Sequence, residues 1–268
     1  MGRIETWEEL QIKNDFLFAK VMSDKKICIK LLEMLLHIKI KDIKYLEKQK
    51  ALDFQKDAKS VRLDVYVEGD ERVFDIEIQA TEKRNLPKRS RYYQGMIDLN
   101  TIKKGEDYEE LKESYVIFIC TFDPFKKGRA QYTFENVCLE DKEIRLNDAS
   151  RRVFFNARDY MTAENEDIRE FLKYVNGGKS NHPFVKELET RVEQVKENKE
   201  WGLEYMTLRM REKEIWKEAT EEATEKVTEE GIKKMVLVLK ELNVPQQTIL
   251  LKIQNQYDLS SEVAKQYL

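Results

Sequence analysis

Two neighbouring segments of the chain carry acidic side chains at places where a buried sheet would favour Val or Ile. In VRLDVYVEGDERVFDIEIQA, residues 61–80, the turn EGDE separates runs of alternating apolar and polar residues at 61–67 and 72–79. Alternation with a period of two is typical of β-strands, so the segment predicts a hairpin. The polar residues that could do chemistry on it are Asp64, Asp75, Glu77 and Gln79.

The expected pairing of the hairpin gathers these residues on one surface. If EGDE closes the hairpin, Val67 pairs with Arg72, and the same register places Asp64 opposite Asp75. Side chains alternate between the two faces of a strand, so the aliphatic residues share one face and the polar residues share the other. The polar face then comprises Arg62, Asp64, Tyr66, Asp75, Glu77 and Gln79. A slip of one residue would send the aliphatic set into water, so this alternation is strongly specified.

Carboxylates on such a face can share a divalent cation. Diagonal positions on adjacent strands lie about 7–8 Å apart at Cα, within reach of converging side chains. Magnesium usually takes one or two carboxylates together with water and substrate phosphate. Two unpaired carboxylates raise each other's pKa, whereas a bound metal compensates their charge. The pattern therefore makes metal-assisted hydrolysis one interpretation of the polar face.

A solvated polar face is the other interpretation of the same residues. Antiparallel hairpins commonly keep one face in water. In the expected register Arg62 lies opposite Glu77 and would pair with it. Spacing alone favours this solvated face over a metal site.

Composition indicates a folded protein rich in solvated helices. Of 268 residues, 41% are hydrophobic and 37% are charged, and the net charge is −3. The charged fraction exceeds the usual quarter or so, which favours long solvated helices. The small net charge by itself points to no polyanionic partner, but it is compatible with a local basic patch.

The cysteine spacing and the lack of long apolar runs argue against a disulfide-rich, zinc-binding or membrane protein. Cys28, Cys120 and Cys138 form no CxxC pair, and His37 and His182 are far apart, so neither a disulfide framework nor a zinc site is expected. The first ten residues lack an apolar signal core, and the longest apolar run, YVIFIC, is too short to span a bilayer. We expect a soluble cytoplasmic protein with free thiols and no membrane contact.

The amino-terminal part predicts an α/β core. Helical spacing occupies residues 12–20 and continues after Asp24, a suitable N-cap. A helix with Pro87 near its start and Gly105 past its end follows the hairpin. Further strands are expected, beginning with 40–49 ahead of the hairpin, then the buried run at 114–122, and a pair of short strands at 130–141 and 143–148.

The second half is predicted to be helical. After NGGKSN, Val185, Leu188, Val192 and Val195 keep the spacing of one apolar seam, which loses its register near Gly202. Either a coiled coil or a helix lying on the core would explain this seam. The end of the chain is expected to form three small helices. The expected domains are a core at 1–160, a charged helical extension at 161–230 and a small helical domain at 231–268.

Three segments in order resemble a known family. KNDFLFAKVM, LDVYVEGDERVFDIEIQ and LPKRSRYYQGMI are similar to the recombination-promoting nuclease and putative transposase family of the PD-(D/E)XK nuclease superfamily. The resemblance runs from about residue 13 to about residue 160, and is weaker through the helices beyond. It implies a restriction-endonuclease-like core, a mixed sheet flanked by helices in the order αβββαβ, with an α-helical C-terminal extension.

The resemblance also implies roles for individual residues. Asp64 and Glu77 match the two acids, which would hold Mg²⁺ or Mn²⁺, and Asp15 matches an acid of the first helix that helps hold metal or water. Gln79 stands where the superfamily usually has a catalytic lysine, and would orient water without bringing charge. A bound metal would polarise the scissile phosphate and activate water.

The helix after the hairpin offers contacts to nucleic acid. Lys88, Arg89 and Arg91 could bind phosphates, and Tyr93 could stack or hydrogen-bond near the cleft. The resemblance favours Arg89 and Tyr93 as residues near the site. From its place at the start of this helix, Lys88 or Arg89 could supply the charge that Gln79 lacks. An ordinary helix with a solvated basic face and buried tyrosines is the alternative.

We therefore expect a metal-dependent DNA endonuclease, with a link to recombination, transposition or defence. Gln79 in place of lysine supports an alternative, a catalytically silent DNA-binding or self-associating protein on the same fold. A third interpretation makes the charged C-terminal half a partner-binding module. A homodimer is compatible with two cuts in a duplex, and the seam at 185–195 would supply its contacts. Phosphate-loop, GxSxG and HExxH motifs are missing from the sequence.

Overall fold

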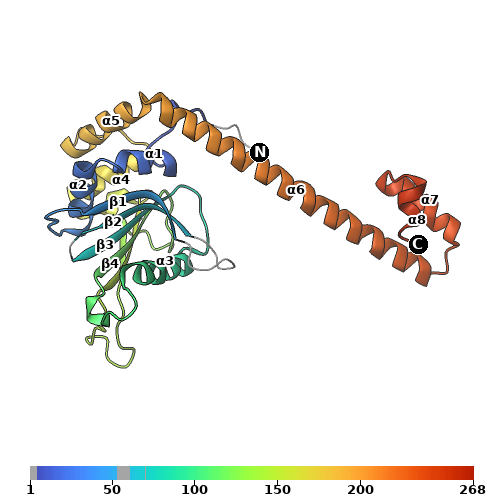
Figure 1. Cartoon of the computed structure of the whole chain (residues 1–268), viewed down its shortest axis with the longest axis horizontal. Helices are drawn as coiled ribbons and strands as arrows, with labels where there is room; N and C mark the ends of the chain where they lie inside the picture. The colour runs from blue at the N-terminus through green and yellow to red at the C-terminus, as the bar shows by residue number, and fades with distance from the viewer. Residues whose placement is uncertain (1–4, 53–60, 70) are drawn as a thin grey trace. The chain divides into compact units, whose positions relative to one another are not determined.

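A six-stranded mixed sheet forms the centre of the first part of the chain (Figure 1). The computed structural model describes residues 5–52, 61–69 and 71–268. The strands lie in the order β1-β2-β3-β4-β6-β5, with β3, β4 and β6 parallel and the other neighbours antiparallel. Their bounds are β1 (Tyr45–Leu52), β2 (Val61–Glu68), β3 (Arg72–Gln79), β4 (Glu113–Cys120), β5 (Gln131–Phe134) and β6 (Ser150–Asn156).

Helices cover both faces of this sheet. Figure 1 shows α3 on one face and α1, α2, α4 and α5 on the other. Their bounds are α1 (Asp15–Met22), α2 (Lys25–Leu36), α3 (Leu86–Thr101), α4 (Glu166–Val175) and α5 (Pro183–Lys196), with short 3₁₀ helices at Tyr108–Glu110 and Tyr160–Thr162. Apart from α2, which is inserted after α1, the succession of α1, β1, β2, β3, α3 and β4 confirms the expected αβββαβ core of the PD-(D/E)XK type.

Local signals explain where the first helices begin. The Asn14 side chain caps α1 by accepting from Leu17 N, and the Asp24 side chain caps α2 by accepting from Lys26 N and Ile27 N. Helix α2 ends at His37, which adopts a left-handed conformation. The predicted N-cap at Asp24 is confirmed, and His37 is a C-cap residue.

The pairing of β2 with β3 differs from the expected register by two residues. Val67 pairs with Phe74 and Tyr66 with Asp75, so the predicted pairs Val67–Arg72 and Asp64–Asp75 are wrong. The connection between the strands shifts by one residue relative to EGDE, because Glu68 pairs with Val73 and Gly69 N donates to Arg72 O at 2.8 Å. A shift of two residues leaves every side chain on its predicted face, so the hydrophobic pattern could not distinguish the two registers. Asp70, which the prediction placed in the turn, and the Arg62 side chain lie outside the described part of the structure.

Strand β6 is an element that sequence reasoning missed. The expected second strand at 143–148 is instead a loop that joins the preceding segment through one bridge, Val137–Arg145. β6 follows it and pairs with β4 along its whole length. Because two arginines precede it, the short buried run VFF was not recognised as part of a strand. Arg151 is accommodated there by an ion pair with Glu113 and a hydrogen bond to the Tyr115 hydroxyl.

Helices α4 and α5 belong to the same compact unit as the sheet. The chain divides into two units, residues 1–203 and 204–268, so this division does not follow the expected boundaries at 160 and 230. The seam of α5 is buried, and the helix contacts α1 and α4. The seam therefore covers the core, as one of the two interpretations held, and its side chains are not exposed for pairing with a second chain.

The second unit contains its own small core. It comprises residues 204–241 of α6 (Lys199–Glu241), together with α7 (Gln246–Tyr257) and α8 (Ser261–Lys265). Its buried residues are Ile232, Val236, Ile249, Ile253 and Ala264. The expected breaks near residues 243–245 and 258–260 are confirmed, but the first of the three small helices predicted at the end of the chain is instead the end of the long helix α6. No described helix is long and apolar enough to cross a membrane.

Replacing a seam residue of α5 should destabilise the first unit. Leu188 is fully buried, so Leu188→Ala should lower the free energy of unfolding by about 2–5 kcal/mol, through lost burial and a residual cavity. Leu99→Ala is the matched control, because Leu99 is 60% exposed on α3 and should cost less than about 0.5 kcal/mol. Urea unfolding measures both. Equal effects of the two substitutions would show that the α5 seam does not cover the core.

Candidate active site

Asp64 and Glu77 face each other across β2 and β3, and their carboxylates take hydrogen bonds from the opposite strand. The regular pairing of the two strands runs as far as Val65 and Ile76. At the next position Asp64 N donates to Glu77 Oε1 at 2.9 Å, and Ile78 N donates to Asp64 Oδ2 at 3.2 Å. The two acids are therefore held together by reciprocal hydrogen bonds to backbone N–H groups.

Arg89 supplies the positive charge beside these acids. Its Nη2 donates to Glu77 Oε2 at 3.1 Å and to the Tyr93 hydroxyl at 2.9 Å, and its Nη1 donates to Gln79 Oε1 at 2.7 Å. The guanidinium carbon also lies 5.3 Å from the Tyr93 ring centroid and 5.4 Å from that of Phe118. Arg89 is thus fixed by hydrogen bonds and by two aromatic rings, which limits its freedom to move.

Gln79 is engaged on both ends of its amide. While its oxygen accepts from Arg89, its Nε2 donates to Thr81 O at 3.0 Å. The amide therefore orients the guanidinium in this structure, whereas the sequence suggested that it orients water. The positive charge that Gln79 lacks is carried by Arg89, near the start of α3, which donates a hydrogen bond to Gln79.

The polar face of the hairpin is buried beneath α3. Asp75 is 0% exposed and Glu77 is 3% exposed, so the solvated-face interpretation is wrong for these two residues. Phe118, Met96 and Ile97 belong to the apolar cluster between α3 and this face. Burial of carboxylates in such surroundings is costly unless they are protonated, paired or bound to a cation.

Asp75 is the acid that sequence reasoning grouped on the polar face but did not assign to the site. Neither of its carboxylate oxygens accepts a hydrogen bond from any N–H or hydroxyl group in the part of the chain that the structure describes. It lies two residues before Glu77 on the same face of β3, and the period-two pattern was the signal that could have drawn attention to it.

The pKa values of three of these acids are raised well above their ordinary range. Burial is the main cause for Asp64, Asp75 and Glu77, and the charge of a neighbouring carboxylate is the second in each case. Arg89 acts in the opposite direction on all three. Negative charge is in excess here, which is the electrostatic setting that attracts a cation.

The remaining predicted residues separate into two groups. Asp15 begins α1, where its carboxylate accepts from Phe16 N at 2.8 Å, and its charge contributes to the raised pKa of both Asp64 and Glu77. Tyr93 is buried beside Arg89, and burial raises the pKa of its hydroxyl to about 12. Lys88 and Arg91 point to solvent, so the structure does not bring them together with the acids.

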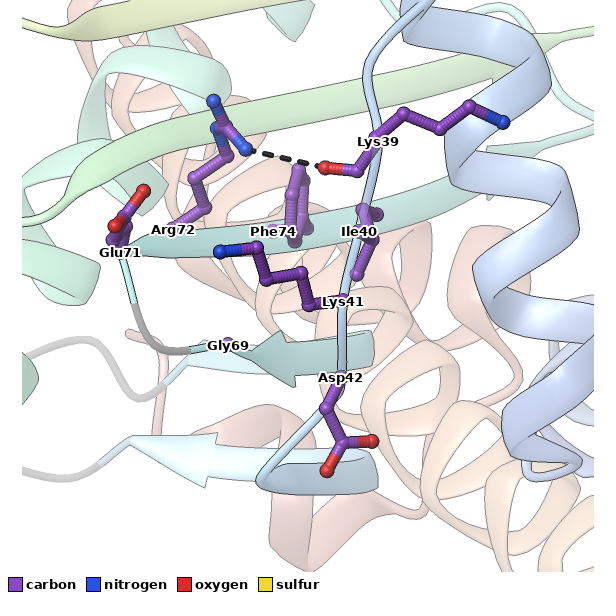
Figure 2. A pocket seen from close by; sticks show the side chains of 8 residues that line it. All are labelled: Lys39, Ile40, Lys41, Asp42, Gly69, Glu71, Arg72 and Phe74. Carbon is purple, nitrogen blue, oxygen red and sulfur yellow. Dashed lines mark hydrogen bonds between the residues drawn. The ribbon is translucent and has the colours of Figure 1, made fainter.

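Two pockets elsewhere in the first unit contain none of these residues. One of 110 Å³ lies at the opposite end of β3, around Arg72, which donates to Lys39 O at 3.5 Å (Figure 2). Another of 620 Å³ adjoins the edge strand β5 and is lined by His37 and Arg129, among others. Arg72 is also paired with Glu113 at 2.6 Å, so its charge is already compensated. The acids instead lie beneath Arg89.

The acids fit a hard divalent cation by chemistry. Among the described residues, no three His, Cys, Asp or Glu side chains form a group that could enclose a metal ion. Magnesium often binds to only one or two carboxylates and keeps several waters, so a closed cage is not required. The orphaned carboxylate of Asp75 and the excess of negative charge also favour a cation.

A comparison with models of protein families assigns the chain to a family. A family model described as PD-(D/E)XK nuclease family transposase matches residues 12–235. The chain belongs to this family. The match extends from the segment just before α1 into the C-terminal half of α6. No curated protein and no solved structure shows a significant match.

Membership in the PD-(D/E)XK nuclease family agrees with the arrangement of the sheet and the acids. The family indicates a nuclease, hence a hydrolase, with DNA as its substrate class. PD-(D/E)XK nucleases generally use divalent metals.

Removing the Asp75 carboxyl should stabilise the metal-free protein, and more so at high pH. A carboxyl whose pKa is raised by folding keeps its proton in the folded state while the unfolded chain loses it. Stability therefore falls as pH rises from about 4, the pKa of an unfolded Asp, through the higher folded value. Asp75→Asn lacks this penalty, so its free energy of unfolding should exceed that of the natural protein by a margin that grows from pH 5 to pH 8.

Urea unfolding in EDTA at several pH values measures this margin. Asp42→Asn is the control, because Asp42 is exposed, bonded to Lys25, and has a lowered pKa. Between pH 5 and pH 8 its substitution should shift stability by a constant amount, because a carboxyl with a lowered pKa is ionised in both the folded and the unfolded chain over this range. A margin for Asp75→Asn that stays constant or shrinks as pH rises would contradict the raised pKa.

Proposed function

We propose that this protein is a metal-dependent DNA endonuclease that hydrolyses phosphodiester bonds. The observation that carries the proposal is the pair Asp64 and Glu77, bonded across two strands and backed by Arg89. Family membership supports the nuclease class and the DNA substrate. The transposase in the family description supports a link to DNA movement, while recombination and defence use the same chemistry.

Asp64 and Glu77 would hold Mg²⁺ or Mn²⁺, with Asp15 near enough to contribute charge. A bound divalent ion polarises a phosphate and lowers the pKa of a bound water. Glu77 has one oxygen bonded to Asp64 N and the other to Arg89, so its carboxylate is held in a defined orientation before any metal arrives. Preorganised ligands of this kind lose little entropy on binding.

Arg89 takes the part that lysine plays elsewhere in the superfamily. Its guanidinium stays charged at any working pH and can donate to a phosphate oxygen next to Glu77. Gln79 and Tyr93 position it, as shown by the hydrogen bonds of 2.7 and 2.9 Å. Charge placed where a phosphate becomes more negative in the transition state is commonly the largest catalytic contribution.

Gln79 in place of lysine also favours a second candidate, a DNA-binding protein with a silent active site. Such a protein would keep the fold and bind DNA without cutting it. A homodimer remains a proposal as well, because a double-strand cut needs two sites. The seam of α5 cannot be its contact surface, since the seam is buried within the first unit.

Plasmid cleavage tests the proposed chemistry. Supercoiled DNA should be nicked or linearised with Mg²⁺ or Mn²⁺ and left intact in EDTA. Asp64→Asn and Glu77→Gln should each reduce the rate by about 100-fold or more, because each removes a ligand charge. Glu109→Gln, an exposed acid outside the site, should leave the rate unchanged. DNA binding without cleavage under any metal would replace this proposal with the silent binding protein.

A second experiment tests whether Arg89 replaces the lysine. Arg89→Ala should lower the cleavage rate by about 100-fold, the usual loss for one electrostatic donor. Adding Gln79→Lys to that variant should restore part of the activity, because it returns a cation to the strand position. Arg211→Ala is the control, since Arg211 is an exposed arginine of α6 in the second unit. Full activity in Arg89→Ala would show that its charge takes no part in cleavage.

A further inference from the structure

We propose that the loop between β4 and β5, residues 121–130, binds the phosphate backbone of nucleic acid beside the acidic site. The inference rests on the proposed function, since it extends the substrate surface of the same site. The loop reads TFDPFKKGRA and presents Lys126, Lys127 and Arg129 to solvent. None of these three residues belongs to the acidic site described above, and none is part of a recognised sequence motif.

The loop leaves the sheet next to the site. Strand β4 is parallel to β3, and its last residue, Cys120, lies beside Gln79. Thr121 N donates to Gln79 O at 3.1 Å, and the Thr121 hydroxyl donates to Ala80 O at 3.0 Å. The loop therefore begins at the carboxyl end of β3, where Gln79 holds Arg89. Nucleic acid bound at the acids must pass this end of the sheet.

The base of the loop is held rigidly by Asp123. Its carboxylate accepts from Phe125 N at 3.0 Å, from Gly128 N at 2.7 Å and from the Tyr132 hydroxyl at 2.8 Å. The negative charge of Asp123 is thus directed inward, to donors of the loop itself. The loop as a whole stays positively charged, because its three basic residues outnumber this one acid.

An aromatic anchor fixes the same loop to the sheet. The Phe125 ring lies 4.8 Å from that of Tyr132, 5.0 Å from that of Phe134 and 5.1 Å from that of Phe154, measured between centroids. The next residue, Lys126, has a φ of 56°, and Gly128 has a φ of 68°. A left-handed conformation is uncommon for lysine, and here it projects the side chain from a turn with an anchored base.

The charges at the tip are available to a ligand. Lys126 lies 4.0 Å from Glu82, and the two side chains are 82% and 60% exposed. An exposed pair at that distance contributes little energy and is easily exchanged for another anion. The segment after β3 adds exposed Lys83 and Arg84 at the same end of the sheet. Basic side chains therefore follow both strands, as expected for a surface that positions a phosphate backbone.

Direct binding to a fluorescein-labelled 30-base-pair duplex in EDTA tests the loop without any cleavage. The variant combines Lys126→Ala, Lys127→Ala and Arg129→Ala in the full chain. Each lost phosphate contact should reduce the slope of log K against log salt by about 0.9, so the slope should fall by about 2 to 3. The conserved-charge variant with Lys126→Arg, Lys127→Arg and Arg129→Lys should bind as tightly as the natural protein.

The matched control is Lys103→Ala with Lys104→Ala, two exposed lysines beyond the end of α3. This pair should leave the slope unchanged, and thermal unfolding should show that both alanine variants are folded. If the triple variant is misfolded, Lys127→Ala alone should still lower the slope by about 0.9. A slope equal to that of the control pair, or a natural protein that does not bind the duplex, would overturn the inference.

Cleavage of the same duplex with Mg²⁺ separates this inference from the proposed function. For an active enzyme, loss of the loop charges should raise KM and leave kcat nearly unchanged. A natural protein that binds but never cuts, with binding lost in the triple variant, would refute the nuclease and support the loop. A natural protein that cuts the duplex, together with unchanged duplex binding by the triple variant, would support the nuclease and refute the role of the loop.

Discussion

The burial of carboxylates beneath α3 is the constraint on which the site depends. Asp75 and Glu77 lie in the buried part of β3, whose other buried residues are apolar, and both are almost completely shielded from water. Buried carboxylates destabilise a folded domain unless something compensates them. Arg89 compensates part of this charge from α3, and the remainder leaves a site with excess negative charge. The burial that makes these carboxylates costly in the metal-free fold is therefore also what supports the proposal that they bind a cation.

Arg89 can have this role because the surrounding residues determine its position. Its guanidinium donates to a carboxylate, an amide and a hydroxyl, and it lies near two aromatic rings. A lysine on β3 would reach the site from the sheet, whereas Arg89 reaches it from the helix above. The replacement of lysine by Gln79 is therefore accompanied by a cation from another element, and the amide supports that cation.

The helices on the opposite face of the sheet support the site mainly by packing, and α1 also brings the charge of Asp15 near Asp64 and Glu77. The seam of α5 is buried and contacts α1 and α4, and α1 carries Asp15. Loss of these contacts would loosen α1 and, with it, the position of an acid that acts on Asp64 and Glu77. A chain cut before α5 would expose this face, because α4 and α5 belong to the same compact unit as the sheet.

The sequence by itself determined which side chains share a face and where several helices begin. The period-two pattern assigned Asp64, Asp75, Glu77 and Gln79 to one surface, and the Asp24 cap and the α5 seam were readable because caps and seams are local or periodic. The pattern could not determine the register of the hairpin, because a shift of two residues preserves the same faces. It also missed β6, whose first residues are arginines that are neutralised by a partner on another strand.

Only the tertiary structure decided that the polar face is buried, that Arg89 reaches Gln79 and Glu77, and that the seam of α5 covers the core. Each of these depends on packing between elements that are separated in the sequence, and hydrophobic periodicity describes one element at a time. A polar strand face looks the same in the sequence whether water or a helix covers it. The helix made the difference here, because its own apolar residues required that face as a partner.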